Sequence, residues 1–208
     1  MKRLVAVFLA AGSACLLSPA MAQDKPETAT AVAKAEPRNT KGLPKELVPI
    51  DDSLTGGLIN DPTYLDWKHY GLGRELVVDE SYPGGGAALR IFMGDPGPVY
   101  AGGVSIPLIA KINKGDRVTV GFFARAIEAP TNDGVGNVRV RFQMDREPYP
   151  GFGETMVELG PEWKWHEVTA VADRSIKSKG IVALQFGTLR QTVEVGQAIV
   201  VTGTPTVF

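Results

Sequence analysis

Two stretches near the middle of the chain, 117–125 and 137–144, alternate apolar and polar side chains with period two. Successive side chains of a β-strand point to opposite faces, so this alternation predicts two half-buried strands. The predicted core faces consist of Val118, Val120, Phe122 and Ala124 in the first stretch and Val138, Val140, Phe142 and Met144 in the second. The opposite faces carry Thr119, Phe123 and Arg125 in the first and Arg139, Arg141 and Gln143 in the second. These second faces, rich in Arg, Gln and aromatic side chains, require a functional explanation.

Shorter alternating runs, separated by turns rich in Gly and Pro, continue the pattern along the chain. They occupy 54–60, 73–79, 87–93, 99–108, 154–159, 164–172, 180–187 and 191–202. Roughly ten short strands with regular turn signals and no convincing amphipathic helix predict an all-β fold, an antiparallel β-sandwich that is most simply a jelly roll. We expect 117–125 and 137–144 to be partners in the middle of one sheet, joined by the hairpin-like link 129–136.

The N-terminus has the pattern of an export signal. Lys2 and Arg3 precede an apolar segment, and Ala20–Met21–Ala22 forms a small-x-small cleavage site. The apolar segment is too short and wrongly flanked for a membrane anchor. We therefore predict a signal peptide over 1–22, cleaved after Ala22, and a periplasmic or secreted location.

The composition argues against disulfide bonds, a nucleic-acid partner and a membrane-spanning segment in the mature chain. Cys15, the only cysteine, lies inside the predicted signal, so the mature chain would fold without disulfides. Two of the 22 basic residues also lie there, which leaves 20 against 23 acidic residues and a mature net charge of −3. A nucleic-acid surface would show a basic excess, so no nucleic-acid partner is expected. No later apolar run is long enough to cross a bilayer, so the chain is not expected to span a membrane.

The segment that follows the predicted signal is rich in Ala, Lys, Glu, Thr and Pro and has no periodic apolar set. We interpret 23–48 as a flexible tether, because such a segment buries too little to offset the entropy of ordering it. It is either a solvated leader or a spacer that holds the domain away from a surface or partner. The remaining residues, 49–208, have the size of a single β-sandwich domain.

A series of short motifs, in this order, resembles the xylanase-associated family 4/9-type carbohydrate-binding modules, which are jelly rolls of the galactose-binding-like superfamily. The motifs are Trp67–Lys68–His69–Tyr70–Gly71, the Gly–x–Ala–Leu–Arg–Ile run 86–91, the Lys–Gly–Asp turn and Val–x–Phe–x–Ala–x–Ala run within 114–126, Val–x–Val–x–Phe–Gln at 138–143, Pro148–Tyr149, Glu–Trp–Lys–Trp at 162–165, Ala–Leu–Gln–Phe–Gly at 183–187 and Gln–Thr–Val–Glu–Val–Gly at 191–196.

The resemblance covers nearly all of 54–202. It implies a jelly roll whose concave sheet or loops bind a glycan, and a carbohydrate-binding role without catalysis. The family includes members with no demonstrated ligand, so the fold alone does not decide the function. Such modules are usually joined to a hydrolase, whereas this one follows a predicted signal peptide and tether.

The candidate ligand-binding residues are planar polar side chains and aromatic rings, because sugars bind to both. Aromatic faces stack on the apolar C–H surface of a sugar, and Arg, Gln and Asn hydrogen-bond its hydroxyl groups. We select Arg139, Arg141 and Gln143 from the second face of 137–144, Arg90, Arg125 and Gln185 from strands expected in the same sheet, and Tyr149 from the Pro- and Gly-rich loop 146–153. The same alternation also predicts a plain solvated sheet face.

The aromatic candidates are more numerous than one site needs. They are Tyr64, Trp67, Tyr70, Tyr82, Tyr100, Tyr149, Phe152, Trp163 and Trp165. Of these, Tyr149 and Phe152 are favoured, because aromatic side chains in loops have less need to fill the core.

No catalytic motif is present in the sequence. The carboxylates are scattered, and neither His69 nor His166 has metal-ligand spacing. We therefore expect no enzyme activity and no cofactor, with a structural calcium ion held by loop oxygens left open.

Three hypotheses remain, in decreasing order of preference. The first is an exported module that binds a polysaccharide or oligosaccharide in one groove. The second is a structural or protein-interaction β-sandwich of the cell envelope, which predicts that the arginines pair with Glu154, Glu158 or Glu167 and that an apolar patch lies elsewhere. The third is a small enzyme, which predicts a deep pocket with two carboxylates or a histidine of shifted pKa.

Overall fold

A computed structural model describes residues 57–78, 81–84 and 86–203. The predicted signal peptide over 1–22 and the predicted tether over 23–48 lie outside the described residues. So do residues 54–56 of the expected first strand, whose described part begins at Gly57.

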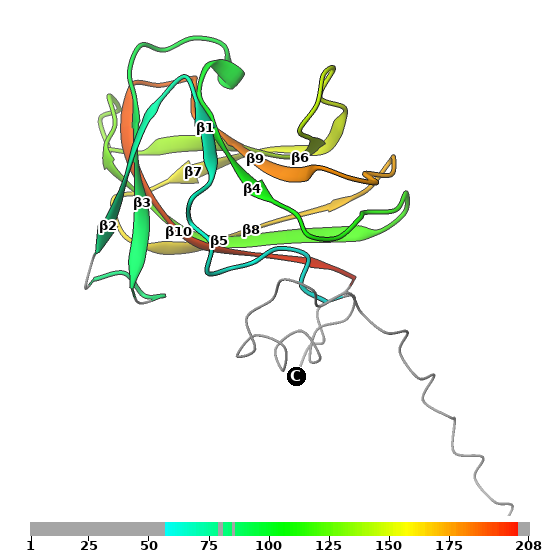
Figure 1. Cartoon of the computed structure of the whole chain (residues 1–208). Helices are drawn as coiled ribbons and strands as arrows, with labels where there is room; N and C mark the ends of the chain where they lie inside the picture. Colours follow the sequence, from blue (N-terminus) through cyan, green and yellow to red (C-terminus); the bar gives the residue numbers. More distant parts are fainter. Residues whose placement is uncertain (1–56, 79–80, 85, 204–208) are drawn as a thin grey trace, which may run out of the picture. The chain divides into compact units, whose positions relative to one another are not determined.

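The described residues form two antiparallel five-stranded sheets that pack face to face (Figure 1). Sheet I has the order β1 (Lys68–Tyr70), β4 (Gly103–Pro107), β9 (Gly180–Gln185), β6 (Gly136–Met144) and β7 (Gly151–Leu159). Sheet II has the order β2 (Gly73–Val78), β3 (Ala87–Met93), β10 (Gln191–Thr202), β5 (Arg117–Glu128) and β8 (Lys164–Val171). The prediction of an all-β jelly-roll sandwich is confirmed; the 3₁₀ turn η1 (Val99–Ala101) is the only helical element in the described part.

The core lies between the two sheets and consists of the inward faces of their strands. All four apolar positions predicted on 117–125 are fully buried, and so are Val138, Val140 and Phe142. Trp67 is also buried, and its indole Nε1 donates a hydrogen bond to the Tyr64 carbonyl at 2.7 Å. Alternation therefore identified the buried faces correctly.

The pairing expected for 117–125 and 137–144 is wrong. β5 belongs to sheet II and β6 to sheet I, so the segment 129–135 crosses from one sheet to the other and the two apolar faces meet across the core. A period of two tells which face of a strand is buried but not which strand lies beside it. Because Arg125 lies on β5 and Arg90 on β3, their expected place beside Arg139 is also wrong.

Several strand boundaries agree with the sequence. β3 and β10 span the predicted 87–93 and 191–202, whereas 99–108 divides into η1 and β4. β1 has no counterpart among the predicted strands. At the start of the described chain, Leu58 forms an isolated bridge with Val201 of β10. Within the described residues, no helix is long and apolar enough to span a membrane.

Candidate functional site

The outward face of sheet I is built from rows of side chains set by strand register. One row runs Tyr70, Gly103, Gln185 and Arg139 from β1 through β4 and β9 to β6. The next row runs Lys68, Ser105, Ala183 and Arg141. Three of the four central positions carry small residues, Gly103, Ser105 and Ala183, whereas β1 and β6 on either side carry large ones, which leaves a hollow over the middle of the sheet.

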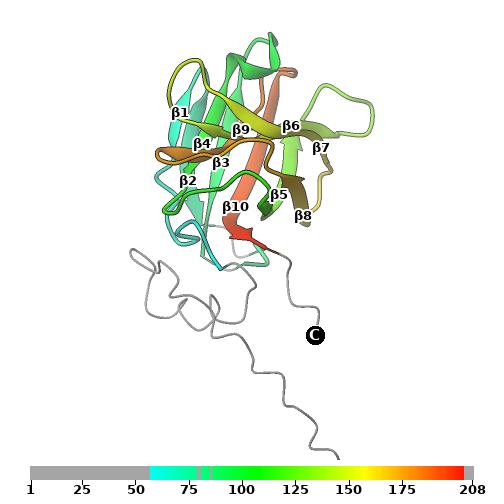
Figure 2. The same cartoon turned by 90° about the vertical axis from the view of Figure 1, so that its right-hand side faces the viewer.

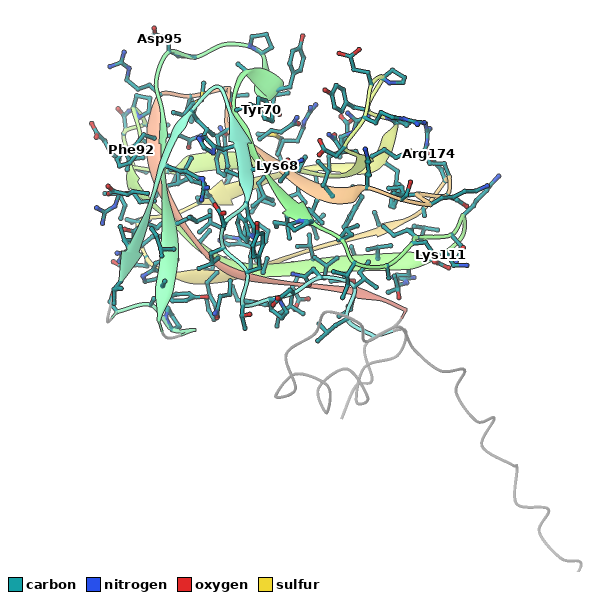
Figure 3. All side chains as sticks on the ribbon, viewed as in Figure 1. Lys68, Tyr70, Phe92, Asp95, Lys111 and Arg174 are labelled. Carbon is teal, nitrogen blue, oxygen red and sulfur yellow. The ribbon has the colours of Figure 1, made fainter. Side chains whose placement is uncertain are left out.

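A groove of about 540 Å³ occupies this hollow, within the usual size range for small-molecule sites. In Figures 1 and 2, η1 and the loop between β6 and β7 rise from the same side of sheet I. Tyr100 of η1 and Tyr149 of that loop both line the groove. Lys68 and Tyr70 line it from β1 (Figure 3).

A second hollow of about 360 Å³ continues the groove towards Tyr64 and Lys179. The two hollows share Lys68, Ser105, Asp145 and Ile181 in their linings. The Lys68 ammonium lies 3.3 Å from an Asp145 carboxylate oxygen, so this ion pair lies where the two hollows meet.

A hydrogen-bond network holds one wall of the groove in place. Arg139 donates through Nε to Gln185 Oε1 at 2.8 Å and through Nη1 to Glu154 Oε2 at 3.1 Å. Gln185 in turn donates through Nε2 to the Tyr70 hydroxyl at 3.0 Å. A Cβ atom at Gly103 would lie 2.9 Å from that hydroxyl oxygen, so the glycine lets the Tyr70 side chain lie across β4. The network fixes these side chains before any ligand binds.

The neighbouring Arg141 and Gln143 keep unused hydrogen-bonding capacity. Arg141 Nε lies 3.1 Å from Glu154 Oε1, but without the geometry of a hydrogen bond. Gln143 is 6% exposed, and its Oε1 has no hydrogen-bond partner among the described residues. A buried polar atom without a partner is costly. Because this oxygen is closed to solvent, a ligand hydroxyl would reach it only if the Gln143 side chain turned towards the groove.

The loop between β6 and β7 presents Tyr149 with an unusual backbone. Tyr149 has φ 54°, a left-handed conformation that is uncommon for a bulky residue, and its amide donates to the Arg146 carbonyl at 2.7 Å. The Asp145 amide donates to the Lys179 carbonyl at 2.8 Å, which ties the start of the loop to the next part of the groove. Such strained residues often occur in ligand-binding sites.

Five of the seven predicted site residues therefore lie together: Arg139, Arg141, Gln143, Tyr149 and Gln185 all line the groove. The favoured Phe152 does not, because its ring is buried and stacks on Phe142 at 5.3 Å between centroids. Sequence reasoning missed Lys68 and Ser105, and it did not separate Tyr70 and Tyr100 from the other aromatic candidates. The residues 68–70 are too few to show alternation, so no sequence signal indicated that they form an edge strand of sheet I.

Arg90 and Arg125, the other two predicted residues, lie on the outward face of sheet II. Arg90 donates to Glu194 Oε1 through Nε at 3.0 Å and Nη2 at 2.7 Å. Arg125 donates to Glu194 Oε2 through Nε at 2.8 Å. Glu194 is 0% exposed. We call these three residues the sealed triad, and we call Arg139, Glu154 and Arg141 the groove triad.

The carboxylates in and beside the groove are paired with basic side chains. Asp145 in the groove and the neighbouring Glu154 both serve as counter-ions of such side chains. Among the described residues, no group of three or more His, Cys, Asp or Glu is placed to hold a metal ion. The groove instead combines hydrogen-bond donors and acceptors with three tyrosines that are 43–62% exposed.

No protein-family model and no curated protein matches the sequence. Solved structures match the fold. A family 4 carbohydrate-binding module has a TM-score of 0.52 and 20% identity, over 66% of this chain and 94% of that one. An arabinose-bound α-L-arabinofuranosidase has a TM-score of 0.54 and 12% identity, over 74% of this chain and 28% of that one.

A third match joins a family 22 carbohydrate-binding module to a catalytic module. It is xylanase 10B of Clostridium thermocellum in complex with xylohexaose, with a TM-score of 0.50 and 10% identity over 75% of this chain and 28% of that one. At these identities the likeness is one of fold. The chain thus has the β-sandwich fold of carbohydrate-binding modules.

Proposed function

We propose that the protein binds a polysaccharide or oligosaccharide, without catalysis, in the groove of sheet I. One observation carries the proposal: three exposed tyrosines, Tyr70, Tyr100 and Tyr149, line a groove whose Arg139 and Gln185 are already held by hydrogen bonds. Tyrosine offers a large stacking surface at low entropic cost, and fixed polar groups orient sugar hydroxyls. The carbohydrate-binding-module fold supports the proposal.

The ion pairs of the groove support a role without catalysis. Glycoside hydrolysis needs two carboxyl groups at a defined separation, one of them able to give up a proton. Asp145 is paired with Lys68, and Glu154 with two arginines. The predicted signal peptide adds an exported location, periplasmic or secreted, to this proposal.

The alternative is an interaction domain of the cell envelope with no sugar ligand. Arg139 and Arg141 do pair with Glu154, as that hypothesis predicts. An apolar hollow of about 190 Å³ on sheet II, lined by Tyr82, Phe123 and Trp165, would then be the contact surface. The two functions use opposite faces of the molecule, so variants of each face separate them.

Affinity electrophoresis of the protein in gels containing xylan, mixed-linkage β-glucan or polygalacturonate tests the proposal. We expect retardation by at least one polymer, and a loss of about tenfold or more in affinity for Tyr70→Ala combined with Tyr149→Ala, since each 1.4 kcal/mol changes affinity tenfold. Trp165→Ala on sheet II is the matched control and should retain affinity. No retardation by any polymer, or equal loss in the control, would contradict the proposal.

A further inference from the structure

The groove triad has more positive than negative charge. Arg139 and Arg141 lie two residues apart on β6 and share the single carboxylate of Glu154. On the opposite side, Lys68 is balanced by Asp145. Counted over the part of the chain that the structure describes, the wall formed by β6 thus carries one positive charge more than its carboxylate balances, in a protein whose formal net charge is −1.

The unused donors belong to Arg141. Arg139 directs its nitrogens to Gln185 and Glu154, whereas no partner of the two terminal nitrogens of Arg141 is found among the described residues. The Arg141 side chain is 22% exposed and lines the groove. A guanidinium with two free N–H groups on one edge matches a planar carboxylate in a bidentate pair.

The surroundings of Arg141 fit a sugar that carries such a carboxylate. Gln143, the next outward residue on β6, provides the acceptor Oε1 that lacks a donor. A Cβ atom at Gly151 would lie 2.9 Å from Arg141 Nε and 2.7 Å from Gln143 Cβ, so glycine at this position of β7 makes room for both side chains. A carboxylate on a sugar ring would satisfy Arg141, and a hydroxyl on the same ring would satisfy Gln143 once its amide turned towards the groove.

We propose that the glycan is acidic and that Arg141 binds the carboxylate of a uronic acid residue. This inference rests on the proposed function of the groove. A neutral glycan would leave the excess charge of the β6 wall unbalanced, whereas a uronate would give the two arginines two carboxylates. Affinity should then fall as salt concentration rises, because the pair lies in a groove open to solvent.

The test compares polymers that differ only in their carboxyl groups. Calorimetric titrations would use polygalacturonate and glucuronoxylan, each beside a preparation whose carboxyl groups have been reduced to alcohols. We expect affinity for at least one native polymer to exceed that for its reduced form by about tenfold or more. Equal affinity for native and reduced forms would overturn this inference but leave glycan binding intact. If the protein bound no native polymer, no reduced polymer and no neutral glycan, the proposed function itself would be overturned.

Charge variants locate the effect. Arg141→Gln should lower affinity for the native polymer by about tenfold and leave that for the reduced polymer within about twofold. Arg117→Gln removes the same charge from an exposed position on β5 of sheet II and should change neither. Glu154→Gln, which releases the shared counter-ion, should tighten binding of the native polymer. Equal weakening by Arg141→Gln and Arg117→Gln would show general charge attraction and contradict the assignment.

Discussion

The sealed triad and the groove triad have the same composition, two arginines around one glutamate, and lie on the outward faces of the two sheets. In the sealed triad the carboxylate is 0% exposed and Arg125 and Arg90 both donate to it. In the groove triad the Glu154 side chain is 49% exposed and, among the described residues, accepts a hydrogen bond only from Arg139. Identical residue types therefore form two different arrangements, one buried and fully hydrogen-bonded and the other exposed and only partly hydrogen-bonded.

Strand position explains the difference. Glu194 lies on β10, the central strand of sheet II, directly opposite Arg90 on one side and Arg125 on the other. The Trp163 ring lies 4.8 Å from the Arg125 guanidinium carbon and packs against Tyr82. The two rings thus lie over the sealed triad. Glu154 instead lies on the edge strand β7, next to an irregularity in its pairing with β6. The donors of the triad at the centre of a sheet are all used, whereas the triad at an edge leaves the terminal nitrogens of Arg141 without a partner among the described residues.

The largest expected effect is on folding stability. Glu194→Gln leaves two guanidiniums without their buried counter-ion and should lower the free energy of unfolding by about 3–5 kcal/mol. Glu154→Gln breaks a solvent-exposed pair and should cost no more than about 1 kcal/mol. Urea denaturation of both variants measures the difference. Similar losses would show that the two triads are energetically alike.

Ligand affinity should depend on residues of the groove and not on the sealed triad, which is the opposite of the expectation for folding stability. Gln143→Ala and Gln185→Ala remove groove contacts, and each should weaken glycan binding by about fivefold to tenfold while leaving unfolding within about 1 kcal/mol of the wild type. Arg90→Gln in the sealed triad should destabilise the fold and leave the affinity of the folded protein unchanged. Calorimetric titration beside urea denaturation separates the two, and a loss of affinity in Arg90→Gln alone would contradict the assignment of the groove.

Removing the Trp163 ring that covers the sealed triad should lower the unfolding free energy by less than the loss of Glu194 does. Trp163→Leu loses the cation–π contact with Arg125 and the packing against Tyr82, and should cost about 1–2 kcal/mol of unfolding free energy. Glycan affinity should not change, because Trp163 belongs to the other face. An unfolding free energy equal to that of the wild type would show that the ring does not help to seal Glu194.

The smallest effect is a pH dependence on sheet II. Burial, and secondarily the Lys164 ammonium, lowers the pKa of His166 below its usual 6.5. The unfolded chain therefore binds more protons than the folded one in this range, and stability should fall as pH drops below about 6.5 towards the folded pKa. Thermal unfolding from pH 7.5 to 5 would measure this loss, which His166→Gln should reduce. An unchanged pH profile in the variant would assign the loss to other groups.

Sequence patterns predicted the fold better than the site. Alternation identified the buried faces of β5 and β6 and the bounds of β3 and β10, because burial on one face leaves a direct period-two signal. Assignment of Arg90 and Arg125 to the same sheet as Arg139 failed, because pairing depends on where the chain crosses between sheets. The unused donors of Arg141 were also beyond sequence, because they depend on Glu154 reaching both arginines from the neighbouring strand.

Backbone amide shifts in an NMR titration test the central claim most directly. The protein would be titrated with an oligosaccharide prepared from the polymer that retards it most strongly. We predict that the shifts concentrate in β4, β6, β9 and the loop 145–150, around the groove of sheet I. Shifts confined to β5, β8 and β10, on the opposite sheet, would contradict the account.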